Sequence, residues 1–157
     1  MSATNESANT VTLLRVIKAP PERVYRAFTD PDAKVRWEPP FGFIGKVHEW
    51  DLRVGGRYKM SFTNFSTGSC HSFGGSFLEL VENERMVVTD AFDDPKLPGT
   101  MRTSISLRPV LNGTELRIVQ AGIPEAVPLE FCYAGWQESL IQLAQLVEPE
   151  IPDAPLE

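Results

Sequence analysis

The strongest constraint on the fold is a change in the spacing of the apolar residues near residue 128, from about 2 residues to about 3.6. Between about Gly45 and Gly122, apolar residues alternate with polar ones, as in half-buried β-strands. Beyond residue 128 they share one helical face, which carries Cys132, Trp136, Leu140, Leu143 and Val147. A sheet must bury its apolar face, and this helix offers the largest apolar surface in the chain. We therefore predict one continuous helix over residues 127–147, packed across an antiparallel sheet.

Turn signals divide the alternating region into strands. The clearest alternation lies in residues 58–63, 101–108 and 115–120. The dipeptide Asn112-Gly113, between the last two runs, is a strong hairpin signal, and Gly55-Gly56 marks an earlier turn. Val11 to Lys18 is rich in β-branched and aliphatic residues, which predicts another strand.

Two short helices are predicted directly after that first strand. Pro20-Pro21 opens one of them, because proline is tolerated in the first helical turn. Asp30-Pro31 ends it and can cap a second helix that runs through Trp37. The order of elements predicts an α+β fold with a curved antiparallel sheet of six or seven strands wrapped around the long C-terminal helix.

The length of 157 residues fits one domain with its own core. We expect that domain to span residues 11–148. Residues 1–10 are polar, and residues 149–157 contain three prolines, so both segments are predicted to be tails.

Charge and cysteine content exclude several kinds of partner. The net charge of −6 argues against nucleic acid, which requires basic stripes, and no row of Lys or Arg points to a membrane surface. The first residues lack the apolar core of a secretory signal, which favours a cytoplasmic protein. Cys70 and Cys132 are therefore expected to be reduced thiols.

Four segments carry a resemblance to a known family. They are residues 16–31 together with Trp37, residues 51–58, residues 75–85 and residues 135–140. Together they resemble the activator of heat-shock-protein-90 ATPase homologue family of the SRPBCC, or START-like, superfamily, over about residues 11–148. The resemblance implies a helix-grip fold with a cavity between sheet and C-terminal helix. It implies no single activity, and it brings chaperone activation and stress response in as alternatives.

Motifs for metal or nucleophilic chemistry are weak. Cys70 and His71 are adjacent rather than spaced as zinc ligands usually are, and His48 is the only other histidine. Gly74-Gly75-Ser76 lacks the second glycine of a nucleophile elbow. Asp51 and Arg53 are better explained as residues that stabilise the Gly55-Gly56 turn. We expect no metal, no cofactor and no catalytic residue among these motifs.

One helix cannot fill the inside of a curved sheet, so some inward side chains should line a remaining space. Gln120 is in phase with Leu116 and Ile118, and its buried amide needs either backbone partners or a polar group of a ligand. Trp37 is expected near the mouth. The predicted ligand-binding residues are Trp37, Tyr58, Met60, Phe62, Met101, Ile105, Gln120, Phe131 and Gly135.

The favoured function is the binding of a hydrophobic or aromatic small molecule in that cavity. One alternative is a cyclase-, dehydratase- or hydrolase-like enzyme acting on such a ligand. Its acid–base groups would come from His48, Glu79, Gln120 and Tyr133. The other alternative is a chaperone-interacting module. The sequence does not specify the oligomeric state, so a homodimer remains open.

Overall fold

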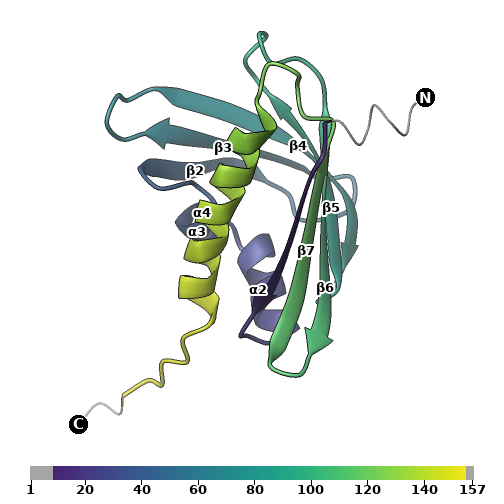
Figure 1. The fold of residues 1–157 in the computed structure, drawn as a ribbon, viewed down its shortest axis with the longest axis vertical. Helices are drawn as coiled ribbons and strands as arrows, with labels where there is room; N and C mark the ends of the chain where they lie inside the picture. The colour runs from purple at the N-terminus through teal and green to yellow at the C-terminus, as the bar shows by residue number, and fades with distance from the viewer. Residues whose placement is uncertain (1–8, 155–157) are drawn as a thin grey trace.

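The computed structural model describes residues 9–154, in which an antiparallel sheet curves around one long helix (Figure 1). Within this range the sheet has seven strands in the order β1-β7-β6-β5-β4-β3-β2. They are β1 (Val11–Ile17), β2 (Phe43–Trp50), β3 (Arg57–Asn64), β4 (Cys70–Val81), β5 (Arg85–Phe92), β6 (Met101–Val110) and β7 (Gly113–Ala121). The predicted α+β helix-grip fold is confirmed. The tail expected over residues 1–10 lies, except for its last two residues, outside the described part.

Three helices cover the concave face within the described residues: α2 (Pro21–Thr29), α3 (Pro31–Trp37) and α4 (Leu129–Val147). Asp30 caps α3, since its carboxylate accepts from the backbone N–H of Asp32 at 2.9 Å. The predicted start of α4 at residue 127 is two residues too early. Pro128 occupies the N-cap, and a residue before proline is disfavoured in the helical region.

The predicted turns are confirmed at both glycine signals. Gly113 begins β7 with a φ of 150°, and a Cβ there would lie 2.1 Å from the carbonyl oxygen of Ile17. Gly55 has a φ of 86°, a left-handed conformation that glycine adopts without strain. Beside it, Arg53 Nε donates to Asp51 Oδ2 at 2.8 Å, as expected for residues that stabilise the turn.

Buried apolar residues of α2 and of the C-terminal half of α4 belong to one hydrophobic core with the sheet. The buried residues of α4 are Ser139, Leu140, Leu143 and Val147. The first half of the predicted stripe, Cys132 and Trp136, is only partly buried. The C-terminal half of α4 thus packs against the core, whereas its first turns are less tightly packed against the sheet.

Candidate functional site

A cavity of about 330 Å³ lies between the concave face of the sheet and the N-terminal half of α4. Small-molecule pockets have volumes of roughly 300–1,000 Å³, so this one is at the small end. Its wall is built by strands β2 to β7, the end of α3, and the first turns of α4. Seven of the predicted residues line it: Tyr58, Phe62, Met101, Ile105, Gln120, Phe131 and Gly135.

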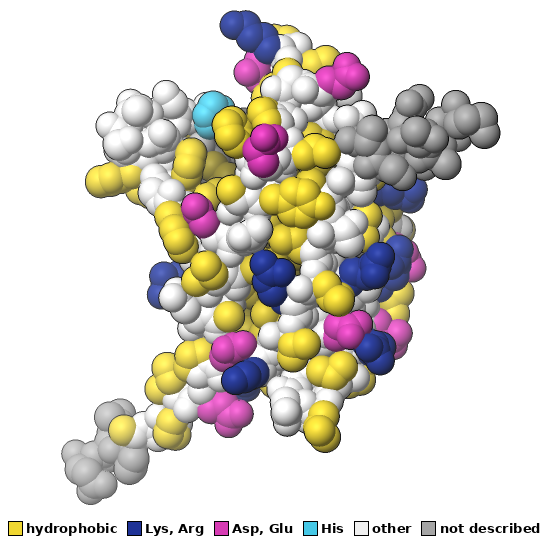
Figure 2. Space-filling model, in the orientation of Figure 1, with side chains coloured by type: hydrophobic (Ala, Val, Ile, Leu, Met, Phe, Trp, Pro, Cys, Tyr) yellow, Lys and Arg dark blue, Asp and Glu magenta, His cyan; other side chains and the backbone are white. Residues whose placement is uncertain are grey.

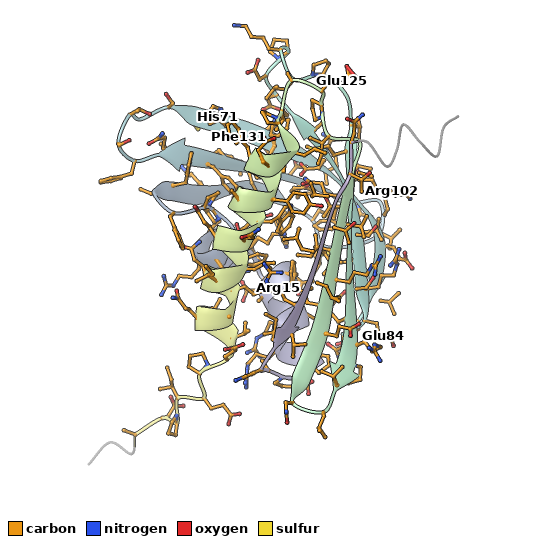
Figure 3. The ribbon with its side chains drawn as sticks, viewed as in Figure 1. Arg15, His71, Glu84, Arg102, Glu125 and Phe131 are labelled. Atoms are coloured by element: carbon orange, nitrogen blue, oxygen red, sulfur yellow. The ribbon has the colours of Figure 1, made fainter. Side chains whose placement is uncertain are left out.

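The mouth of the cavity is marked by lining residues that reach solvent. His71 of β4 is exposed, and Phe131 in the first turn of α4 is 69% exposed. Figure 3 shows both at the N-terminal end of α4, and Figure 2 shows apolar side chains gathered around this end of the helix. Lining residues such as Met101 and Ile105 are buried and form the inner wall.

Two predicted residues lie elsewhere. Trp37, expected at the mouth, is fully buried in the core, where its Nε1 donates to the carbonyl oxygen of Ala27 at 2.8 Å and its ring packs edge-on against Phe28. Met60 is 1% exposed and does not reach the cavity, although it shares a strand face with Tyr58 and Phe62. The alternation along a strand predicts which face of the sheet a side chain lies on. The curvature of the sheet then determines whether that side chain lines the cavity or packs in the core.

Gln120 lines the cavity and has side-chain partners rather than the backbone partners considered from the sequence. Its Oε1 accepts from Nε1 of Trp136 at 3.0 Å, and its Nε2 lies 3.6 Å from the sulfur of Met101. A thioether is a weak acceptor, so the amide retains capacity to donate into the cavity.

The other acid–base candidates of the enzyme alternative lie outside the cavity. His48 Nε2 lies 2.8 Å from Ser61 Oγ, Glu79 pairs with Arg85 at 2.9 Å, and the Tyr133 hydroxyl accepts from the backbone N–H of Thr12 at 3.3 Å. None of these three side chains lines the space. Among the described residues, no group of three or more His, Cys, Asp or Glu side chains is arranged to hold a metal ion.

Four polar residues at the inner end of the cavity, beside the predicted Tyr58 of β3, were missed by the sequence reasoning: Lys34 of α3, Glu38 at the C-cap of α3, Asp90 of β5 and Thr103 of β6. Lys34 is 8% exposed, and its ammonium lies 3.6 Å from Glu38 Oε1 and 5.4 Å from the ring centre of Phe28. The Tyr58 hydroxyl donates to the carbonyl oxygen of Thr89 at 3.1 Å.

The end of α3 is held in place by α4. Its last carbonyl groups have no partners within the helix. Gln142 Nε2 donates to the carbonyl oxygens of Trp37 and Pro39 at 2.9 and 2.6 Å, and Ser139 Oγ donates to that of Glu38. These bonds fix the backbone from which Glu38 extends to the cavity.

Burial and like charge change the acidity of this polar group. Removal from water, followed by the charge of Glu38, raises the pKa of Asp90 to about 7. Burial also raises the pKa of Glu38, and the ammonium of Lys34 opposes that rise. The pKa of Tyr58 is raised by burial and by the nearby Asp90 carboxyl. The cavity therefore contains a carboxyl group that changes protonation near neutral pH.

The sequence did contain a signal for Asp90. It follows Val88 and precedes Phe92 at strand spacing, so it is in phase with apolar neighbours, like Gln120 on β7. No comparable signal marks Lys34 and Glu38, because an i,i+4 ion pair on a short helix is typical of a solvated surface.

Comparisons with known proteins agree with this architecture. A sequence model of the family described as activator of Hsp90 ATPase homolog 1-like protein matches residues 18–148. A crystal structure from Chromobacterium violaceum is 59% identical with a TM-score of 0.90, covering 91% of this chain and 99% of that one. A structure from Nitrosomonas europaea is 24% identical with a TM-score of 0.75, covering 91% and 96%. The solution structure of an AHSA1-like protein from Aeromonas hydrophila is 21% identical with a TM-score of 0.73, and the match covers 88% of this chain and 92% of that one. The last two similarities show the fold alone.

No curated protein matches this chain. Within residues 9–154, none of the helices combines the length and apolar character needed to cross a bilayer.

Proposed function

Because this chain belongs to the family of activator of Hsp90 ATPase homolog 1-like proteins, whose fold is suited to holding a ligand, we propose that it binds a hydrophobic or aromatic small molecule in the cavity. The observation that carries this proposal is the unfilled space of about 330 Å³ between sheet and α4. For scale, an apolar cavity of about 150 Å³ in another protein binds benzene. A molecule larger than benzene would fit here.

The character of the wall supports an apolar ligand. Phe62 and Phe73 pack edge-on with ring centres 4.8 Å apart, and Met86, Val88 and Ile105 extend the same surface inward. Binding of an apolar ligand is favoured by about 25 cal/mol for each Å² of apolar surface that it removes from water. The few polar groups are confined to particular positions, as in sites that orient a ligand.

The enzyme alternative now depends on a different residue. Since His48, Glu79 and Tyr133 lie outside the cavity, an acid–base step would have to use a group of the wall, and Asp90, with a pKa of about 7, is suited to proton transfer at neutral pH. We keep ligand binding as the proposal because it requires only the cavity.

A filling substitution tests the proposal. The neutral fluorescent probe N-phenyl-1-naphthylamine should bind the native protein at one site. Gly135→Leu should weaken that binding at least tenfold without destabilising the fold, because a Cβ at Gly135 would contact only Pro40, at 3.8 Å, and helical glycine is itself unfavourable. The matched control is Ala134→Leu, which faces solvent on the same helix.

A second control uses Met60, which packs in the core. Met60→Trp should overpack that region and lower stability by about 1–3 kcal/mol. The proposal fails if the wild type shows no saturable probe site, or if Gly135→Leu and Ala134→Leu bind the probe equally well.

A further inference from the structure

Three buried oxygen atoms on the cavity wall lack hydrogen-bond partners among the described residues. They are Glu38 Oε1, Asp90 Oδ1 and Thr103 Oγ1. Thr103 is only 6% exposed. An unsatisfied buried polar atom costs about 1–3 kcal/mol, so three on one wall indicate a missing donor.

The sheet register brings two of these atoms onto the same surface. Asp90 of β5 lies opposite Met101 of β6, and Thr103 lies two residues further along β6, opposite Val88. Diagonal neighbours of this kind on one face are roughly 7–8 Å apart. Glu38 approaches from α3, and its charge raises the pKa of Asp90, which requires proximity in a poorly solvated space. The three atoms therefore surround one end of the cavity.

The charges at this end do not balance. Glu38 and Asp90 carry two carboxyl groups, whereas Lys34 is the single Lys or Arg among the described residues that line the cavity. Lys34 is also engaged with Glu38 at 3.6 Å. Burial and the charge of Glu38 raise the pKa of Asp90 more than the Tyr58 hydroxyl and the Lys34 ammonium lower it, so an ionised Asp90 is an unfavourable buried charge. A second cation would relieve it.

We infer that the ligand is a hydrophobic amine, whose protonated ammonium group binds Asp90 together with Glu38 and Thr103. This inference rests on the proposed function and specifies the chemistry of its ligand. A primary ammonium has three N–H donors, which could reach Asp90 Oδ1, Thr103 Oγ1 and, together with the Lys34 ammonium, Glu38 Oε1. Trp50 also lines the wall, and an aromatic ring near the head group favours a cation. The apolar body would extend along Phe62 and Phe73 toward the mouth.

Three ligands with one body and different head groups test the inference: 4-phenylbutylamine, 4-phenylbutanol and 4-phenylbutyrate. In competition with N-phenyl-1-naphthylamine at pH 8, the amine should bind at least about tenfold more tightly than the alcohol, because hydrogen bonds to charged groups contribute more than neutral ones. The carboxylate should bind most weakly. Asp90→Asn should remove the advantage of the amine, so that the ratio of amine to alcohol affinity falls to about one.

The control for that variant is Glu79→Gln, which makes the same charge change on a half-exposed side chain outside the cavity. Thr103→Val provides an independent variant and should weaken the amine about threefold or more relative to the probe. Thermal melts will establish that each variant is folded.

The pH dependence in the wild type needs no variant. Amine affinity should rise from pH 6 to pH 8 as Asp90 loses its proton, by up to about tenfold per unit below its pKa. The other titratable groups that face the cavity are Lys34 from α3, Glu38 at its C-cap, Tyr58 from β3, His71 from β4 and Cys132 from α4. His71→Gln should retain the rise, which separates Asp90 from the histidine at the mouth.

Two failures are distinguishable. If the probe binds but amine and alcohol compete equally at every pH, the cavity binds neutral ligands, and this inference is wrong while the proposed function stands. If the wild type binds neither the probe nor any of the three ligands, the proposed function fails as well.

Discussion

Asp90→Asn should make the protein more stable at pH 8 and leave its stability nearly unchanged at pH 4. Asp90 is a carboxyl group whose pKa is raised by burial and by Glu38. The folded protein therefore holds this proton more tightly than the unfolded chain does, and ionisation opposes folding. Asparagine has nearly the same shape and carries no charge, so it removes that unfavourable contribution.

The magnitude follows from the shift in pKa, from 3.8 to about 7. At about 1.4 kcal/mol per pKa unit, this difference amounts to about 4 kcal/mol as an upper limit. Below pH 4 both states are protonated and the penalty is absent. Between pH 4 and 7 the unfolded chain loses the proton first, so wild-type stability falls, and above pH 7 the penalty is complete.

The assay is urea unfolding followed by tryptophan fluorescence at pH 4, 5, 6, 7 and 8. The difference in unfolding free energy between Asp90→Asn and wild type should grow with pH and level off above pH 7. The control is Asp94→Asn, which makes the same change at an exposed carboxyl group and should show no such trend. A difference independent of pH, or a variant less stable than wild type throughout, would refute the reasoning.

Three further changes test the packing around the cavity. Leu140→Asp should cost several kcal/mol by burying an unpaired charge, whereas Leu146→Asp, at a partly exposed position of the same helix, should cost far less; equal thermal melts would contradict the assignment of the buried face. Lys34→Met should destabilise the fold more at pH 8 than at pH 5, because the ammonium lowers the pKa of Glu38; urea midpoints at the two pH values measure this. Trp37→Phe should cost about 1–3 kcal/mol by leaving the Ala27 carbonyl without its partner, and an unchanged midpoint would refute that role.

The sequence predicted the elements of the fold well because their signals are local. Strand alternation, the Asn112-Gly113 hairpin and the cap at Asp30 each depend on residues within a few positions of one another. The phase of β7 also placed Gln120 on the cavity side correctly. These features need no knowledge of how the elements pack.

Depth within the molecule was harder to predict than orientation. Trp37 was assigned to the mouth, but α3 packs against α2 and places it in the core. Met60 has the same phase as two cavity residues and still meets only core. Lys34 is buried because the ion pair, which would be solvated on an isolated helix, lies at the cavity wall beside the rings of Phe28 and Trp37. Each of these outcomes depends on the curvature of the sheet and the packing of distant segments.

The uneven burial of α4 means that its C-terminal half is held firmly while its N-terminal turns have fewer packing contacts. Its fixed end, from Ser139 to Val147, is anchored both in the core and to the last carbonyls of α3. Its N-terminal turns, around Phe131, lie over the cavity. We expect amide hydrogen exchange to be slow from Ser139 to Val147 and faster in the first turns of α4. A bound ligand should slow exchange only in those first turns. A molecule could then reach the interior by deflecting one end of a single helix while the rest of the protein stays folded.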